Sequence, residues 1–249
     1  MKTYLIVFPL SFLAGLIDAI GGGGGLISLP AFIFAGLPAH LAVGTNKLSA
    51  SCGTSVVTLR MLKNKLVNLK LAVPTIVMAI LGSSIGARLS LIIPEEIFLK
   101  AMIFVLPICG FFVLNKSMFQ DKTNNDSDDI TLKTYIIACL SALIIGIYDG
   151  LYGPGTGTFL IIAFTVFAKI KVMTANANAK VINLTTNVTS LVIFLLNGQV
   201  LIPLGLMAAV ANMAGGYIGA GLAIKNGAKI VRPCIILVLF ILLIKIIFG

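Results

Sequence analysis

The chain has 249 residues, of which 59% are hydrophobic and only 10% are charged, whereas a typical soluble domain carries about 25% charged residues. This composition excludes a soluble globular protein, because a core of this size could not hide so much apolar surface, and it predicts a protein of the lipid bilayer. The net charge of +10 does not indicate nucleic-acid binding, since the Lys and Arg residues lie mostly in short loops between apolar runs.

The first half of the chain, residues 1–114, is predicted to hold one interrupted apolar segment followed by three membrane-spanning helices. The interrupted segment covers about 3–36 and contains five consecutive glycines at Gly21–Gly25. A helix needs roughly 20 predominantly apolar residues to cross a hydrocarbon core of about 30 Å. Three runs that approach this length follow at about 41–62, 68–90 and 95–114.

A polar stretch separates this half from a second one with the same order of segments. Residues 115–131 are rich in charged and amide side chains and are predicted to form a solvated linker. In the second half, residues 132–249, the interrupted segment covers about 132–168 and is broken at Gly153–Gly157 by the sequence Gly-Pro-Gly-Thr-Gly. The spans after it are expected at about 174–196, 200–223 and 229–248.

Corresponding positions of the two halves carry identical residues. Gly15-Leu16-Ile17-Asp18, which runs into the first glycine break, corresponds to Gly146-Ile147-Tyr148-Asp149, which runs into the second. Further along, Lys47 corresponds to Lys180. Because such matches keep a nearly constant offset along a whole half of the chain, they indicate a duplication. Transporters often arise from such repeats. We therefore predict an all-α polytopic membrane protein made of two homologous repeats.

The distribution of basic residues predicts that the repeats are inverted. In the first half the loop between the second and third segments is basic, whereas its counterpart 197–201 has no charge. In the second half the neighbouring loops are the basic ones. Cytoplasmic loops are enriched in Lys and Arg, so equivalent loops are placed on opposite sides of the membrane. The basic residues are Arg60, Lys63, Lys65 and Lys70 in the first half, and Lys169, Lys171, Lys225, Lys229 and Arg232 in the second.

Inversion also requires an odd number of crossings in each half. Three spans give that number when the interrupted segment enters and leaves on the same side of the membrane. The first arm of segment 3–36 is itself long enough to cross, so a parallel arrangement with four crossings in each half remains the alternative.

The two glycine breaks are the first candidate for a functional site. Glycine and proline at this density end a helix, and the N–H and C=O groups that they free cannot face lipid, so they must pack inside protein or line a wet cavity. The helices predicted at 26–35 and 158–167 would direct their N-terminal N–H groups toward that cavity, where they favour an anion. We expect the two breaks to meet at the membrane centre and to share one translocation site, to which they contribute Gly22, Gly24, Gly153 and Gly155.

Close packing of helices through small residues is the alternative explanation for glycines within a span. It is the preferred explanation for Gly82-x-x-x-Gly86 and for the corresponding Gly215-x-x-x-Gly219, because this spacing lets helices touch. A nucleotide-binding glycine loop is excluded, since no strand precedes either break.

Four charged residues inside apolar sequence are the second candidate. Asp18 and Asp149 precede the two breaks, and Lys47 and Lys180 lie near the start of the next segment. An ionised side chain at the bilayer centre costs about 2.5–3.5 kcal/mol on insertion scales, so each of the four needs a partner or a task. Either Asp–Lys pairs lock the breaks, or the lysines bind an anionic substrate while the aspartates take up protons. Nearby amide groups would complete a site for an oxyanion: Asn46, Asn183 and Asn187.

These residues resemble the TauE/SafE family of bacterial membrane proteins, which is named for sulfite and organosulfonate exporters. The resemblance covers essentially the whole chain and implies transport of small sulfur-containing or carboxylate anions across a bacterial plasma (inner) membrane, with protons as the candidate coupling ion. Thr45 is a minor departure, since many family members have Ala there. The motifs are Gly15-Leu16-Ile17-Asp18, Gly44-Thr45-Asn46-Lys47, Tyr148-Asp149-Gly150-x-x-Gly153-Pro154-Gly155-x-Gly157 and Ala179-Lys180-Val181-x-Asn183.

The predicted function is secondary transport of a small anion by a multi-pass protein of the plasma membrane. Its expected partners are the anion and the lipid bilayer, without nucleic acid, and a homo-oligomer remains open. Catalysis, a metal site and a cofactor are not expected, because one histidine and four scattered cysteines provide neither a nucleophile–base set nor metal-ligand spacing. A cation transporter or channel with Asp18 and Asp149 as ligands is the alternative function.

Overall fold

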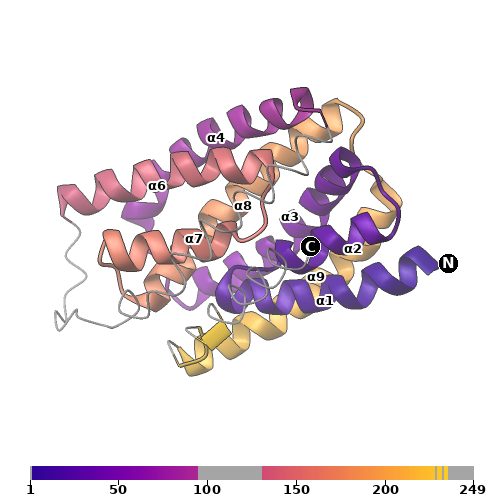
Figure 1. Ribbon diagram of the computed structural model, residues 1–249. Helices are drawn as coiled ribbons and strands as arrows, with labels where there is room; N and C mark the ends of the chain where they lie inside the picture. Colours follow the sequence, from indigo (N-terminus) through magenta and orange to yellow (C-terminus); the bar gives the residue numbers. More distant parts are fainter. Residues whose placement is uncertain (1, 95–130, 228, 232, 235–249) are drawn as a thin grey trace.

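A computed structural model describes residues 2–94, 131–227, 229–231 and 233–234. Within these ranges the chain is helical and contains no strand (Figure 1). The long helices are α1 (Lys2–Gly21), α3 (Ala39–Lys63), α4 (Leu69–Ile92), α6 (Leu132–Leu151), α8 (Val172–Leu196) and α9 (Ile202–Asn226). The short elements are α2 (Gly25–Phe34), α7 (Thr156–Ile162) and the π-helix η2 (Ala163–Phe167).

The helices confirm the predicted fold class of an all-α polytopic membrane protein. α3, α4, α8 and α9 lie where four of the spans are predicted, within a few residues at each end. Five described helices are long and apolar enough to cross a membrane, namely α1 from Thr3 onward, α4, α6, α8 and α9. The predicted span 95–114, the linker 115–131 except Thr131, and the span 229–248 except residues 229–231 and 233–234 lie outside the described residues.

α3, like α8, carries many polar side chains that are enclosed by protein. Its residues Thr45, Asn46 and Lys47 are all buried. The outer helices show the opposite pattern, since large apolar side chains of α4 and α6 such as Val73 and Ile144 are each 64% exposed. Polar helices in a membrane face the interior of the bundle, so α3 forms part of a polar centre inside an apolar shell.

Small residues bring pairs of helices into close contact, as predicted for the two Gly-x-x-x-Gly motifs. A Cβ atom on Gly86 of α4 would overlap the carbonyl oxygen of Ile147 on α6, and one on Gly215 of α9 would overlap that of Phe12 on α1. The second glycine of α9, Gly219, lies equally close to Leu16. The packing explanation for these motifs is confirmed.

The central helices α3 and α8 run antiparallel. Lys47 near the start of α3 donates to Asn187 in the later part of α8, and Thr58 near the end of α3 donates to the carbonyl oxygen of Lys180 near the start of α8. α9 instead runs parallel to α3, because Gly205 lies against Leu48 and Tyr217 accepts a hydrogen bond from Arg60. The two segments predicted to be equivalent, α3 and α8, therefore point in opposite directions.

The two glycine breaks meet inside the bundle. Gly22 has a φ of +85°, and a Cβ atom there would overlap the backbone of Gly157 and Thr158, so only glycine fits this crossing. The N–H of Thr158 donates to the Gly22 carbonyl (3.3 Å), and its hydroxyl donates to the Gly21 carbonyl (2.6 Å). Groups freed by the first break are thus satisfied by the second. Beyond the breaks, the predicted short helices are present as α2 and as α7 with η2.

Candidate functional site

A polar cavity lies where the two breaks meet. Its empty volume is about 410 Å³, including the part that opens to the surface. Side chains from both halves surround it, contributed by α1, α2, α3, α6, α7, α8 and α9. The lining residues are Asp18, Gly22, Gly24, Gly25, Ser28, Asn46, Lys47, Ala50, Thr54, Asp149, Gly153, Thr156, Gly157, Asn183, Asn187 and Asn212.

One buried ion pair lies in the wall of this cavity. Lys47 Nζ is 2.9 Å from Asp149 Oδ2, and the two side chains are each 2% exposed. The same ammonium group donates to Asn187 Oδ1 (3.1 Å), and Asn187 Nδ2 in turn donates to Asn183 Oδ1 (3.1 Å). The hydroxyl of Thr156 lies 2.6 Å from Asp149 Oδ1. A cation, a carboxylate and two amides therefore form one connected polar network.

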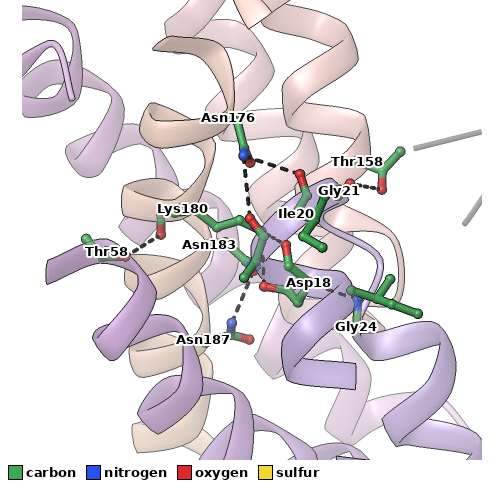
Figure 2. A network of polar contacts seen from close by, with 12 residues as sticks. Asp18, Ile20, Gly21, Gly24, Thr58, Thr158, Asn176, Lys180, Asn183 and Asn187 are labelled. Atoms are coloured by element: carbon green, nitrogen blue, oxygen red, sulfur yellow. Dashed lines mark hydrogen bonds and ion pairs between the residues drawn. The ribbon is translucent and has the colours of Figure 1, made fainter. Parts of the chain in front are cut away.

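A second ion pair joins a lysine of the second half to an aspartate of the first, with the Lys180 side chain fully buried and the Asp18 side chain 16% exposed. Lys180 Nζ is 3.1 Å from Asp18 Oδ2 and also donates to the backbone carbonyl of Asp18 near the end of α1. The N–H of Gly24 donates to Asp18 Oδ1 (3.3 Å). Figure 2 shows Lys180 reaching Asp18 from α8, with Gly24 on the other side of the carboxylate.

Each lysine therefore pairs with the aspartate of the other half. Lys47 comes from the first half and binds Asp149 from the second, while Lys180 comes from the second and binds Asp18 from the first. The charges of the two pairs cancel, which is what burial of four ionised groups requires. Pairing was one of the two explanations that the sequence left open for these residues, and it describes the arrangement seen here.

Nine of the eleven predicted site residues line the cavity. The exceptions are Lys180, which touches the cavity only through Asp18, and Gly155, which is the N-cap of α7 with a φ of +85°. The residues in the lining are Asp18, Gly22, Gly24, Asn46, Lys47, Asp149, Gly153, Asn183 and Asn187.

Asn46 has a buried amide oxygen that lacks a hydrogen-bond partner. The residue is 7% exposed, and no group among the described residues donates to its Oδ1. Buried amide groups normally have partners. By rotating about its terminal bond, this amide can present either an acceptor or two donors to a guest in the cavity.

Seven lining residues are absent from the predicted site, and two of the polar ones are Asn212 and Thr156. Asn212 lies in α9, where its Nδ2 is 3.4 Å from Ser49 Oγ. The signal that could have found it is a single amide in an otherwise apolar span, since polar residues at membrane depth usually face the interior. Thr156 is the second, and it follows Gly155 directly in the second break.

The cavity carries hydrogen-bond donors and no cluster of metal ligands among the described residues. In the described part of the chain, no group of three or more His, Cys, Asp and Glu residues could hold a metal. The cavity lining contains one ammonium group, two carboxylates that are paired with lysines, four amides and the hydroxyls of Ser28, Thr54 and Thr156. Such groups bind an oxyanion through charge-assisted and neutral hydrogen bonds.

Comparison with known proteins adds an independent observation. The family profile described as sulfite exporter TauE/SafE matches residues 7–246. A probable membrane transporter protein of Haemophilus influenzae is 33% identical over 244 residues, which cover 98% of this chain and 94% of that protein.

Two further relatives carry the same description. The probable membrane transporter protein ORF9 of a Sinorhizobium species is 36% identical over 242 residues, covering 96% of this chain and 90% of that protein. The probable membrane transporter protein YfcA of Escherichia coli K12 is 31% identical over 245 residues, covering 98% and 89%. No solved structure matches the chain significantly. The chain is therefore a multi-pass membrane transporter that belongs to the sulfite exporter TauE/SafE family.

Proposed function

We propose that the protein is a secondary transporter of a small anion, of the size of sulfite, an organosulfonate or a short carboxylate, and that the anion binds in the cavity between the two breaks. The observation that carries this proposal is the placement of Lys47, a buried ammonium group in the wall of a polar cavity inside an apolar helical bundle. Lys47, Asn46, Asn183 and Asn187 are the proposed binding residues.

The uncharged groups explain how the anion can both bind and leave. Asn183 and Asn187 are neutral donors one helical turn apart on α8, and Thr54 faces them from α3. A site of several fixed cations would hold an anion too tightly to release it within a transport cycle. Neutral amides contribute less binding energy for each hydrogen bond than charged groups do, and transport requires both entry and release.

The pairing of the carboxylates supports an anion over a cation as the substrate. A cation bound by Asp18 and Asp149 would have to displace Lys180 and Lys47, respectively, from buried contacts of 3.1 and 2.9 Å. Removal of one partner from a buried ion pair is strongly unfavourable. We propose that protons are the driving ion and that one of the two aspartates binds them.

Alternating access is proposed to arise from two inverted repeats, residues 1–114 and 132–249. The antiparallel course of α3 and α8 supports this arrangement, because these helices occupy equivalent places in the two halves. In many transporters, one of two inverted repeats rocks against the other around a fixed central site. The cavity lies between the halves, as such a mechanism requires.

We propose that the basic end of the bundle faces the cytoplasm of a bacterial cell, with the protein in the plasma (inner) membrane. The end of α3 at Lys63 and the end of α9 near Lys225 lie at one end, because these helices are parallel. The uncharged loop 197–201 lies at the other end, where the N–H of Leu201 donates to the Thr45 hydroxyl (2.9 Å). The positive-inside rule assigns the basic end to the cytoplasm.

Cysteine labelling of intact cells tests this orientation. In a background without the native cysteines, Gly198→Cys should react with a membrane-impermeant maleimide added outside, and Lys65→Cys should react only after the cells are opened. If both positions react from outside, or if Lys65→Cys alone does, the proposed topology is wrong.

A flux assay tests the proposed function. Purified full-length protein in proteoliposomes should transport sulfite or methanesulfonate faster than protein-free vesicles do, and it should not transport divalent cations such as Mn²⁺. Lys47→Gln should reduce anion flux, whereas Thr185→Val, an isosteric change on α8 outside the cavity lining, should not. Cation flux without anion flux would establish the alternative function instead.

A further inference from the structure

We propose that the two ion pairs have different tasks: Lys47–Asp149 opens to exchange Asp149 for the transported anion with uptake of one proton, whereas Lys180–Asp18 stays closed and holds the first break. This inference rests on the proposed function and deepens it, because it names the group that binds the anion and the group that binds the proton. The two pairs occupy corresponding places in the sequence, so the difference lies in their surroundings.

The supports of the Lys47–Asp149 pair are side chains. Lys47 donates to the amide of Asn187, and Asp149 accepts from the hydroxyl of Thr156. Amide and hydroxyl groups reorient by rotation about single bonds. When the pair opens, Asn187 can therefore turn its Nδ2 toward an incoming anion without any movement of the backbone.

The supports of the Lys180–Asp18 pair are main-chain atoms. Lys180 donates to the carbonyl of Asp18 itself, and the N–H of Gly24 donates to the carboxylate (3.3 Å). The Asp18 carbonyl also accepts from the N–H of Gly22 (2.8 Å), so Lys180 binds a carbonyl that already closes the end of α1. These main-chain contacts tie the Lys180–Asp18 pair to the geometry of the first break (Figure 2).

The lining of the cavity distinguishes the two lysines as well. Lys47 and Asp149 both belong to the lining, so an anion can approach the ammonium group directly. Lys180 is fully buried and lies behind Asp18, outside the lining. Asn46, whose Oδ1 has no hydrogen-bond partner among the described residues, precedes Lys47 directly in α3 and is part of the same lining.

Charge balance then identifies Asp149 as the group that binds the proton. Before binding, two lysines and two aspartates sum to zero. A monoanion that takes the place of Asp149 on Lys47 would leave two anionic groups around one ammonium in a site shielded from water, and burial of an unpaired carboxylate is costly. If Asp149 accepts a proton from the aqueous side, the sum returns to zero. The anion and the proton then move together, and Lys47 keeps its proton throughout.

Of the two carboxyls in the lining, Asp149 is the one whose cationic partner, Lys47, also lines the cavity. Lys47 faces it from α3 and Thr156 from the start of α7, while Asp18 across the cavity remains balanced by Lys180. α4, which packs along α6, carries Arg88 on its exposed surface. The neighbouring phenol of Tyr148 donates to the Pro154 carbonyl (2.5 Å), and Tyr152 completes the titratable groups on this side.

Calorimetric titration of the purified full-length protein with methanesulfonate tests the inference. A sulfonate stays fully ionised between pH 5 and 8, so any pH dependence of binding arises from the protein. Titration in buffers of different ionisation enthalpy counts the protons bound. We expect uptake of about one proton per anion and an affinity that rises about tenfold for each pH unit lowered. In Asp149→Asn the proton uptake should disappear and the affinity should become independent of pH.

Matched double variants compare the two pairs without leaving a buried charge unpaired. Lys47→Gln with Asp149→Asn should fold but bind methanesulfonate about 10- to 100-fold more weakly, because a charge-assisted hydrogen bond is lost. Lys180→Gln with Asp18→Asn should still bind it with uptake of about one proton. Both double variants remove one positive and one negative charge from the protein interior. A difference in their affinity for methanesulfonate or in their proton uptake therefore depends on which of the two pairs was removed.

The possible failures are distinguishable. Binding without proton uptake in the wild-type protein, persistent uptake in Asp149→Asn, or loss of uptake in Lys180→Gln with Asp18→Asn would each overturn the assignment of tasks while leaving anion transport in place. A wild-type protein that neither binds nor transports sulfite or a sulfonate would overturn the proposed function itself.

Discussion

The two glycine breaks perform the same task with different means. In the first break, the carbonyls of Gly21 and Gly22 are satisfied by Thr158 of the other half. In the second, Tyr148 donates to the carbonyl of Pro154 within its own half, and Thr156 lies 2.6 Å from the Gly153 carbonyl.

The aromatic residues near the second break add packing to these hydrogen bonds. The ring of Tyr148 packs edge-on against Tyr152 and Phe159, at centroid distances of 6.3 and 5.5 Å. The second break therefore has additional bracing within its own half, whereas the Gly21 and Gly22 carbonyls of the first break take their partner from the second half. Two breaks related by duplication need not be equally stable, and their substitutions should differ in effect.

The largest effect is expected at the crossing point of the two breaks. Gly22→Val would place a side chain inside the backbone of Gly157 and Thr158, at a φ of +85° that Val rarely adopts. We expect no monodisperse protein on size-exclusion chromatography in detergent. Gly36→Val is the control, because its φ is also positive (+91°) but nothing lies within 4 Å of a Cβ atom there.

In Gly36→Val, the free energy of unfolding should fall by only about 1–2 kcal/mol, which is the cost of a positive φ for a residue other than glycine. This variant should elute as the wild-type protein does. A well-folded Gly22→Val protein would show that the breaks do not cross as described.

The next largest effect concerns the ion pair that holds the first break. Lys180→Ala leaves Asp18 buried without its cation, which should lower the free energy of unfolding by about 3–5 kcal/mol. Combining it with Asp18→Asn should restore part of the stability, because the unpaired charge is removed. Thermal unfolding in detergent measures both. Equal stability of the single and double variants would argue against the pairing of Lys180 with Asp18.

Smaller effects should separate the two breaks directly. Thr158→Val removes a 2.6 Å hydrogen bond to a buried carbonyl of the first break and should cost about 1–3 kcal/mol of unfolding free energy. Tyr148→Phe removes one hydrogen bond from the second break but keeps the ring packing, so about 0.5–1.5 kcal/mol is expected. The reverse order would mean that the second break is the less well braced one.

Much of the fold could be predicted from the sequence because lipid imposes simple rules. Helices α4, α8 and α9 follow from apolar length, and the breaks follow from glycine and proline at membrane depth. The charged residues at the site could be recognised for the same reason, since Lys47 and Asp149 are conspicuous in apolar sequence.

What the sequence could not provide was the pairing. Whether Lys47 binds Asp18 or Asp149 depends on how the halves pack, and no local rule distinguishes the two carboxylates. The same holds for Lys180, which resembles Lys47 in its sequence context but lies outside the lining. Asn212 was overlooked because a single amide in α9 has no repeated counterpart to draw attention to it.

The most direct test of the central claim, that a small anion binds beside Lys47 in the cavity between the breaks, is an experimental structure with bound selenite. Selenium marks the anion by anomalous scattering, and selenite has the shape and charge of sulfite. We expect the strongest selenium peak within hydrogen-bonding distance of Lys47 Nζ, with Lys47 separated from Asp149 and the Lys180–Asp18 pair intact. A peak only at the basic loops, or an anion in the cavity with Lys180 as its ligand, would show that the anion does not bind beside Lys47.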